Sequence, residues 1–472
     1  MFDDEENVFD DQNLRDELVR FNAFINGESF GFIDSDRWEL LIDHFLFHGK
    51  FDEAILCIQE ALSQFSHNDL FRLKLAQCLS AKGKLKDSID LLSDIEKVGF
   101  ISFELFQTKA YIYSQLKESN KAIKYYIKAL DFASDIEKED ILLDLAVEYQ
   151  NTSNYSLSLK VLKEAIRLNP KNESAICEIA FCYDSLGDFD NSIKTYSDFI
   201  DENPYSYVTW YNLGNAYSKI EDFDNAIKAY DYSILIKEDF GPVYFNLANA
   251  FLAKGKYMKA IECFHKNIEV DGEDSLALCY IGECHEQLDE LELAKIFYKR
   301  SLEIDPLLPD AWLGLGIIED MEGNINIGLG FIKKASYLDP ENPLVHHVLA
   351  SAYEKVEQFK NADDTYQVAL ALDPNNEDCL INYVKLLKKE SDQNALDYLN
   401  IYDTLKHNNK ILSVLKVSVN WDIGNRKKAI ILFKECIEIN KFNALKLFEI
   451  NPKLKTIPQL TSLVSKLDKE IK

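Results

Sequence analysis

Two consecutive stretches of equal length decide the fold: residues 207–240 read YVTWYNLGNAYSKIEDFDNAIKAYDYSILIKEDF, and residues 241–274 read GPVYFNLANAFLAKGKYMKAIECFHKNIEVDGED. At matching places both carry an aromatic residue, Leu, a small residue and an aromatic residue, followed by Ala, an aromatic residue and a small residue. These are Trp210, Leu213, Gly214, Tyr217, Ala226, Tyr230 and Ser233, then Tyr244, Leu247, Ala248, Phe251, Ala260, Phe264 and Asn267. The first four recur at helical spacing, so each stretch predicts two helices packed along one apolar stripe.

Positions within each stretch are numbered from 1, so that Tyr207 and Gly241 both stand at position 1. Positions 8 and 20 hold small residues, where we expect the two helices to come closest. Position 15 lies between the helices and is Gly in six units, where it supplies the turn: Gly49, Gly83, Gly187, Gly255, Gly323 and Gly424.

The same phase continues through most of the chain. We place the starts of about twelve units at Ser35, Asp69, Phe103, Glu139, Glu173, Tyr207, Gly241, Ser275, Pro309, Pro343, Glu377 and Lys410. Two extra residues near Glu137 and Lys138 precede the fourth unit, and the eleventh is one residue short. The pattern is degenerate at both ends.

The pattern in residues 35–443 resembles the tetratricopeptide repeat, a helix–turn–helix of 34 residues. The resemblance implies an all-α fold, an α-solenoid in which helix pairs stack into a right-handed superhelix and the first helix of each unit lines the concave wall. It also implies a protein that binds other proteins. Residues 1–34 are expected to form an acidic tail and an N-terminal capping helix, and residues 444–472 to form C-terminal capping helices.

Charge and cysteine usage limit the class of protein. The formal net charge of −28 disfavours nucleic acid and anionic membranes as partners of the main body. Residues 1–40 hold twelve acidic and three basic side chains, whereas residues 397–472 hold fourteen basic and eight acidic ones. Nine cysteines without framework spacing indicate reduced thiols, and we expect a cytoplasmic protein with no transmembrane segment. The acidic start lacks the features of a secretory signal.

The wall that faces a partner should carry positions 2, 5, 9 and 12, with position 6 beside them. Positions 6 and 9 of the two central units hold Asn212, Asn215, Asn246 and Asn249, which look like the asparagine ladders that grip a peptide main chain in some members of the family. A carboxamide both donates and accepts, as a peptide bond requires. The alternative is that Asn is a solvated surface residue. Tyr211, Phe245, Tyr280 and Glu283 complete the candidate peptide-binding set, as an aromatic and acidic groove.

Other chemistry is weakly indicated. A carboxylate clamp of the family would need Lys or Arg where Pro242, Asn246, Leu276 and Tyr280 stand. Cys279 and Cys284 are too far apart around a helix to share a metal ion. No catalytic motif is present, so we predict no catalytic residues, metal or cofactor. Gly314 either softens its unit or lets a ligand backbone approach the wall.

We therefore expect a non-enzymatic scaffold or adaptor that binds an extended, basic or mixed segment of a partner protein in its concave groove. An alternative is a subunit of a larger ribonucleoprotein or membrane-associated assembly, docked through the basic C-terminal end. A third option is the regulatory subunit of an enzyme. The oligomeric state is open.

Overall fold

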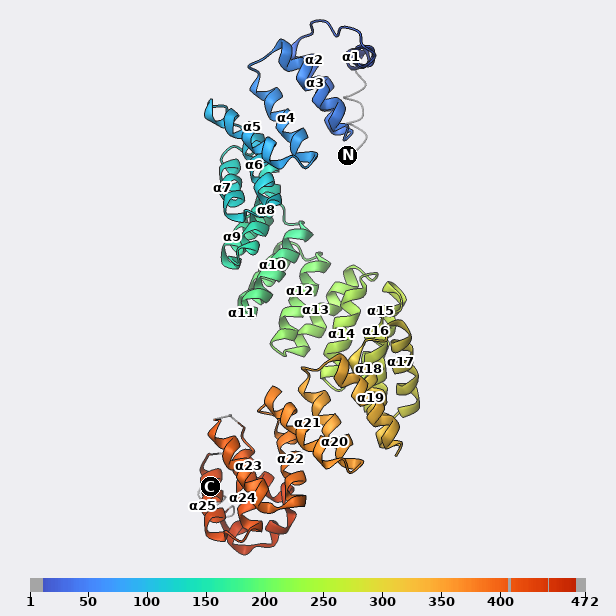
Figure 1. The fold of residues 1–472 in the computed structure, drawn as a ribbon, viewed down its shortest axis with the longest axis vertical. Coiled ribbons are helices and arrows are strands. Elements are labelled where there is room, and N and C mark those ends of the chain that lie inside the picture. The colour runs from blue at the N-terminus through green and yellow to red at the C-terminus, as the bar shows by residue number, and fades with distance from the viewer. Residues whose placement is uncertain (1–11, 406–408, 440, 464–472) are drawn as a thin grey trace. The chain divides into compact units, whose positions relative to one another are not determined.

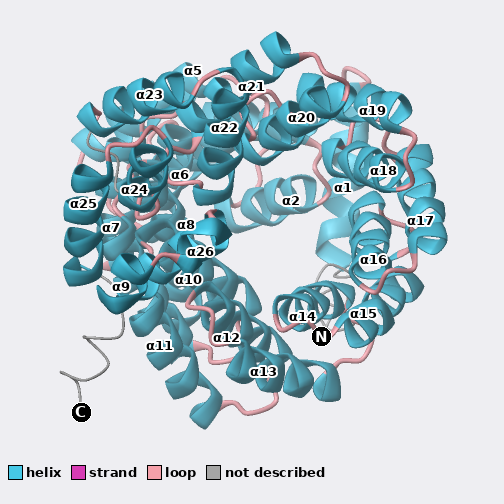
Figure 2. Ribbon diagram, turned by 90° about the horizontal axis from the view of Figure 1, so that it is seen from below, coloured by secondary structure: helices cyan, strands magenta, loops and turns pink. Residues whose placement is uncertain are grey.

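The computed structural model describes residues 12–405, 409–439 and 441–463. Throughout these residues the chain forms helices joined by short loops, and none of them lies in a β-strand (Figure 2). The predicted all-α class is confirmed. The predicted acidic tail lies almost entirely outside the described residues.

The chain divides into two compact units, Met1–Glu238 and Asp239–Lys472. In each unit, helices that follow one another in the chain pack as hairpins, as α16 and α17 do in Figure 1. The first unit contains α1 (Gln12–Ile25), α2 (Ser35–Phe47), α3 (Phe51–Gln64), α4 (Asp69–Ala81), α5 (Leu85–Lys97), α6 (Phe103–Gln115), α7 (Ser119–Leu130), α8 (Asp135–Asn151), α9 (Tyr155–Leu168), α10 (Glu173–Leu186), α11 (Phe189–Glu202), α12 (Tyr207–Lys219) and α13 (Phe223–Ile236).

The second unit repeats the same hairpin architecture. It contains α14 (Gly241–Ala253), α15 (Tyr257–Asp271), α16 (Ser275–Gln287), α17 (Leu291–Ile304), α18 (Pro309–Met321), α19 (Ile325–Leu338), α20 (Pro343–Lys355), α21 (Phe359–Leu372), α22 (Glu377–Glu390), α23 (Asp392–Thr404), α24 (Leu412–Asp422), α25 (Arg426–Ile439), α26 (Lys441–Ile450) and the 3₁₀ helix η1 (Pro452–Thr456).

Most first helices begin at the residue where the sequence phase places the start of a unit, because the preceding residue caps the helix. Its side-chain oxygen accepts a hydrogen bond from a backbone N–H of the first turn, which leaves fewer of these groups unpaired. The capping residues are Asn68, Ser102, Asn172, Ser206, Asp274, Asn342 and Asn376.

Helix α8 is an exception, since it begins at Asp135 rather than at the predicted Glu139. The Ser134 hydroxyl accepts from the backbone N–H of Glu137, and the Glu137 carboxylate accepts from the backbone N–H of Ser134 at 2.7 Å. This capping box fixes an earlier start. The two extra residues therefore lengthen α8 to 17 residues instead of forming a separate loop.

The turn inside each repeat depends on a left-handed residue at position 15. The six predicted glycines all have positive φ there. In five other repeats a residue with a side chain takes the same conformation, at a cost of about 1 kcal/mol each: Lys117, Ser153, Glu221, Asp289 and Glu357. The packing of the two helices thus imposes the turn geometry, and glycine only lowers the free energy of the left-handed conformation.

The close approach predicted at positions 8 and 20 is clearest between α18 and α19. A Cβ placed on Gly328 would lie 2.6 Å from the backbone oxygen of Gly316. Any side chain at this point would force the two helices apart.

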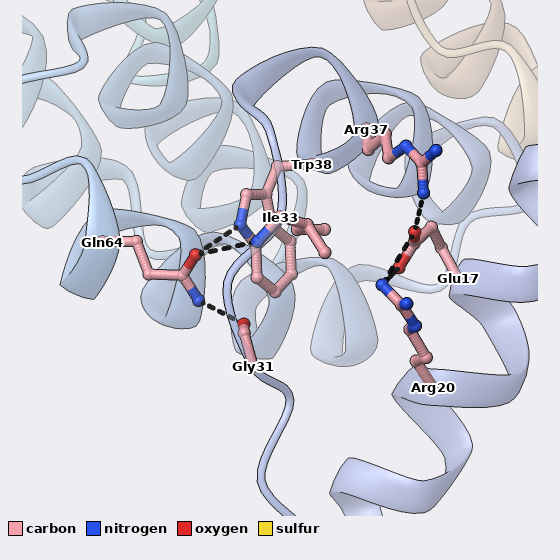
Figure 3. A network of polar contacts seen from close by, with 7 residues as sticks. All are labelled: Glu17, Arg20, Gly31, Ile33, Arg37, Trp38 and Gln64. Atoms are coloured by element: carbon pink, nitrogen blue, oxygen red, sulfur yellow. Dashed lines mark hydrogen bonds and ion pairs between the residues drawn. The ribbon is translucent and has the colours of Figure 1, made fainter.

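The N-terminal helix α1 is fixed to the first repeat by polar contacts (Figure 3). The carboxylate of Glu17, only 1% exposed, accepts hydrogen bonds from Arg37 at 2.8 Å and from Arg20 at 3.3 Å. Gln64 on α3 donates to the backbone oxygen of Gly31 and accepts from the indole N–H of Trp38. The Arg37–Glu17 pair joins α1 to α2, whereas Gln64 joins the segment before α2 to α3; the capping role of α1 stays a prediction.

At the other end, Leu447, Leu454 and Leu460 are buried in the core around α24 and α25. Part of the C-terminal cap predicted for residues 444–472 therefore covers the last hairpin. Its final residues, including Leu467 and Ile471, lie outside the described residues.

Candidate functional site

Three of the predicted peptide-binding residues lie on α12 of the first unit. Asn212 is 7% exposed, and its side-chain nitrogen is buried with no hydrogen-bond partner among the described residues. The side-chain oxygen of Asn215 accepts a hydrogen bond from the Tyr230 hydroxyl at 2.9 Å. The ring of Tyr211 lies 6.2 Å from that of Tyr230. Asn215 therefore also has a structural role within its own repeat.

The other five predicted residues lie in the second unit, on α14 and α16. Asn246 and Asn249 are half-buried on α14. The structure brings together Phe245 and Tyr280, whose rings meet edge to face with centroids 5.8 Å apart. Burial raises the pKa of the Tyr280 hydroxyl, and the nearby charges of Asp310 and Glu283 raise it further. The aromatic and acidic residues are thus assembled on α14 and α16, whereas the four-residue Asn ladder stays a prediction.

Two further carboxylates, Glu286 on α16 and Asp310 on α18, lie around Glu283. Burial raises the pKa of Glu283, and the charges of Glu286 and Asp310 raise it further. Burial also raises the pKa of Glu286, against the effect of its hydrogen bond from Tyr298. Asp310 keeps an exposed surface, yet desolvation by the surrounding protein, and then Asp339, raise its pKa. We call Glu283, Glu286, Asp310, Phe245 and Tyr280 the acidic surface.

The acidic surface has no cation of its own. Among the residues that the structure describes, Glu283, Glu286 and Asp310 form no ion pair with Lys, Arg or His. Like charges gathered in a partly desolvated place disfavour ionisation, and a nearby cation would relieve this. The surface is therefore suited to a positively charged ligand.

The next repeats show which position supplies a cation to the carboxylate at position 12. Asp320 at position 12 of α18 pairs with Lys355 of α20, and Glu354 at position 12 of α20 pairs with Lys389 of α22 at 2.7 Å. Each lysine stands at position 13 of the following repeat. Glu286 is also at position 12, but the residue in the place of the lysine is Met321, which is 58% exposed.

Gly314, which the sequence left open, makes room for a side chain of its own protein. A Cβ on Gly314 would lie 2.3 Å from the ring of Tyr298. Its role is thus to accept Tyr298 of α17, which explains a glycine outside the usual small-residue positions.

Sequence reasoning missed Glu286, Asp310 and Met321. Glu286 and Asp310 stand at positions 12 and 2, on the predicted wall, so their location was available from the repeat phase. The absence of an ion pair at Glu286 and Asp310 among the described residues could not be read from the repeat phase, because it becomes visible only when the carboxylates and lysines of adjacent repeats are compared.

Within the described residues, no group of three or more His, Cys, Asp or Glu side chains could hold a metal ion. Within the same residues, no helix combines the length and apolar character needed to cross a membrane.

Sequence profiles of the tetratricopeptide repeat match residues 40–97, 103–136, 139–172, 178–206, 207–240, 242–274, 277–306 and 345–380. The chain is also similar to anaphase-promoting complex subunit 3 of Schizosaccharomyces pombe, with 24% identity over 118 residues. That match covers 25% of this chain and only 18% of the subunit's length.

Solved structures with some similarity include the APC/C hetero-tetramer Cut9–Hcn1, with a TM-score of 0.44 and 16% identity over 82% of this chain and 90% of that chain. MamA has a TM-score of 0.32 and 22% identity over 35% and 91% of the two chains. YrrB, a repeat protein with an unusual peptide-binding site, has a TM-score of 0.31 and 19% identity over 39% and 95%. Because the repeat profiles cover more than half of its residues, the chain belongs to the tetratricopeptide repeat family.

Proposed function

We propose that this protein is a non-catalytic scaffold that binds a basic, extended segment of a partner protein on its acidic surface. The observation that carries the proposal is that, among the described residues, three carboxylates next to the Phe245–Tyr280 ring contact form no ion pair with Lys, Arg or His. Family membership supports a binding role, and similarity to a subunit of the anaphase-promoting complex is consistent with a place in an assembly.

The surface offers two kinds of contact to a basic side chain. Glu283, Glu286 and Asp310 supply charge, and a hydrogen bond that involves a charged group is stronger than a neutral one. The half-buried rings of Phe245 and Tyr280 can pack on the alkyl part of a lysine, or attract its ammonium group through their faces. Asn246 and Asn249 on α14 are proposed to bind the main chain of the same segment, and Asn212 and Asn215 on α12 are proposed to bind a peptide main chain in the first unit.

The test uses fluorescence anisotropy of the full-length protein with a labelled peptide of alternating lysine and serine, and a glutamate–serine peptide as the negative probe. The triple variant Glu283→Gln, Glu286→Gln, Asp310→Asn should weaken binding of the basic peptide by about tenfold or more. The matched control removes three exposed charges from the second helices, through Glu262→Gln, Glu292→Gln and Glu303→Gln. Equal weakening by both triples would mean that only net charge matters, and would remove the site.

The basic C-terminal end remains a second proposal, for docking to an anionic assembly. Lys453 and Lys455 of η1 are exposed, and among the described residues no ion pair involves them. If this end binds RNA or anionic lipid, affinity should fall steeply with salt, and Lys453→Gln with Lys455→Gln, which leaves the buried leucines in place, should reduce the slope. A salt slope unchanged by these substitutions would refute this docking mode.

We also infer a cytoplasmic location, because the nine cysteines lack the spacing of a disulfide framework and most of them are buried. Fractionation of the native cells checks this directly. Recovery in an oxidising compartment would refute it.

A further inference from the structure

A separate pocket lies in the first unit, where α4, α6 and α8 meet. Its volume is about 290 Å³, and its lining includes Gln77, Ser80, Gln107, Thr108, Tyr111 and Asp144. No Lys, Arg or His lines it. The lining thus combines hydrogen-bonding groups with one carboxylate and no positive charge.

Ser80 marks the inner wall of this pocket. The side chain is 9% exposed, and its hydroxyl oxygen is buried with no hydrogen-bond partner among the described residues. A buried polar atom without a partner costs free energy, so a native structure rarely keeps one without a reason. A ligand that donates a hydrogen bond would satisfy it.

Two carboxylates make the pocket region negative. Asp144 has an exposed surface in the pocket, and Glu148, one helical turn further along α8, is 2% exposed. One oxygen of Glu148 accepts from the Ser114 hydroxyl at 2.5 Å, while the other is buried without a partner. Neither carboxylate has an ion pair among the described residues.

Desolvation by the pocket walls raises the pKa of the Asp144 carboxyl. Hydrogen bonding from Tyr126 opposes this shift, whereas the charges of Asp140 and Glu148 add to it. Burial and neighbouring negative charges therefore disfavour the ionised form of Asp144. The same is true of Glu283 on the acidic surface of the other unit.

Helices α2 and α4 of the same unit show how a cation pairs with carboxylates between two first helices. Between α2 and α4 the ammonium group of Lys74 lies 2.5 Å from the Asp43 carboxylate and 3.3 Å from that of Glu39. Lys74 stands at position 6 of its repeat, and Asp144 stands at position 6 of the repeat formed by α8 and α9. Helices α2 and α4 thus supply an ammonium group to their own carboxylates, whereas among the described residues no ammonium group pairs with Asp144.

We propose that the pocket between α4, α6 and α8 binds an ammonium group on an unbranched alkyl chain, from either a lysine side chain of a partner or a free alkylamine. An ammonium group has three donors and no acceptor, which matches the carboxylate of Asp144 and the hydroxyl of Ser80. The ring of Tyr111, 50% exposed, flanks the alkyl chain. This site lies in the other unit from the acidic surface and does not depend on it.

The experiment uses full-length protein carrying the acidic-surface triple variant, so that the acidic surface does not contribute, and a glycine–serine peptide without lysine measures binding to the asparagine residues. Calorimetry is carried out with cadaverine and with a glycine–serine peptide that contains one lysine. Asp144→Asn should weaken binding by about tenfold. The matched control Asp190→Asn, an exposed carboxylate on α11, should leave it unchanged. Binding of cadaverine alone assigns the pocket to free amines, and tighter binding of the peptide assigns it to a partner lysine.

Ser80→Ala provides a second, independent variant. Because the hydroxyl has no hydrogen-bond partner in the described part of the chain, its removal should leave the melting temperature unchanged or raise it, while binding weakens several-fold. The proposal is overturned if neither probe binds, if Asp144→Asn binds as the parent does, or if Ser80→Ala lowers stability and keeps affinity.

Discussion

The hydroxyl of Tyr298 donates a 2.8 Å hydrogen bond to the carboxylate of Glu286. The ring that makes this contact lies between two glycines, because a Cβ on Gly282 or Gly314 would lie 2.9 Å or 2.3 Å from it. The same link recurs where Tyr366 donates to Glu354 at 3.3 Å. In both repeats the tyrosine at position 24 therefore orients the glutamate at position 12. In the repeat formed by α16 and α17, that glutamate is Glu286 of the acidic surface.

Gly314→Ala is expected to destabilise the protein by about 1–3 kcal/mol, because the added methyl group clashes with a buried ring. Urea denaturation measures the change. Gly330→Ala is the matched control: its Cβ would have nothing within 4 Å, so alanine should stabilise α19 by roughly 0.5–1 kcal/mol. Equal effects of the two variants would contradict the packing role given to Tyr298.

Met321→Lys should supply the cation that Glu286 lacks. The new lysine stands where Lys355 and Lys389 stand in the next two repeats, so we expect it to pair with Glu286 and to weaken binding of the lysine–serine peptide by about tenfold. Met258→Lys adds the same charge at an exposed methionine of α15 and should change affinity little. If both variants weaken the peptide equally, Met321 has no special place in the site.

The repeat phase could be predicted from sequence because small, aromatic and capping residues recur at fixed spacing and each acts locally. The left-handed conformation of Glu221 or Glu357 could not, since no side-chain preference of glutamate favours it and helix packing imposes it. The place of Phe245, Tyr280 and Glu283 on one wall followed from helical geometry. The need for glycine at position 314 could not be predicted from helical geometry, because the ring that fills the space beside Gly314 comes from α17 of the preceding repeat.

Binding of the basic peptide should weaken as pH falls, starting above pH 4.5, the ordinary pKa of a glutamate. The raised pKa values of Glu283, Glu286 and Asp310 mean that these groups take up protons earlier than exposed carboxylates do, and a protonated carboxyl cannot pair with a cation. Anisotropy titrations at a series of pH values measure this. An affinity that stays constant down to the ordinary pKa range would contradict the assignment.

Stability should depend on pH in the opposite direction. A carboxyl group whose pKa is raised by folding stabilises the folded state most at pH values below its unfolded pKa. This stabilisation is lost as the pH rises through its folded pKa. The triple variant Glu283→Gln, Glu286→Gln, Asp310→Asn should therefore be more stable than the parent at pH 7, with the difference closing toward pH 4. A triple variant that is less stable at neutral pH would show that the carboxylates support the fold rather than a ligand.

The asparagine ladder predicts that Asn212→Ala combined with Asn246→Ala weakens peptide binding by about tenfold, since each carboxamide is proposed to exchange hydrogen bonds with the peptide main chain. A glycine–serine peptide isolates this contribution because it has no basic side chain. The control pair, Asn361→Ala and Asn394→Ala, changes exposed amides on second helices. Because the side-chain nitrogen of Asn212 is buried and has no hydrogen-bond partner among the residues that the structure describes, Asn212→Ala alone should not lower the melting temperature. Unchanged affinity in the Asn212 and Asn246 double variant would leave these residues as surface and packing amides, and peptide binding would then depend on the acidic surface alone.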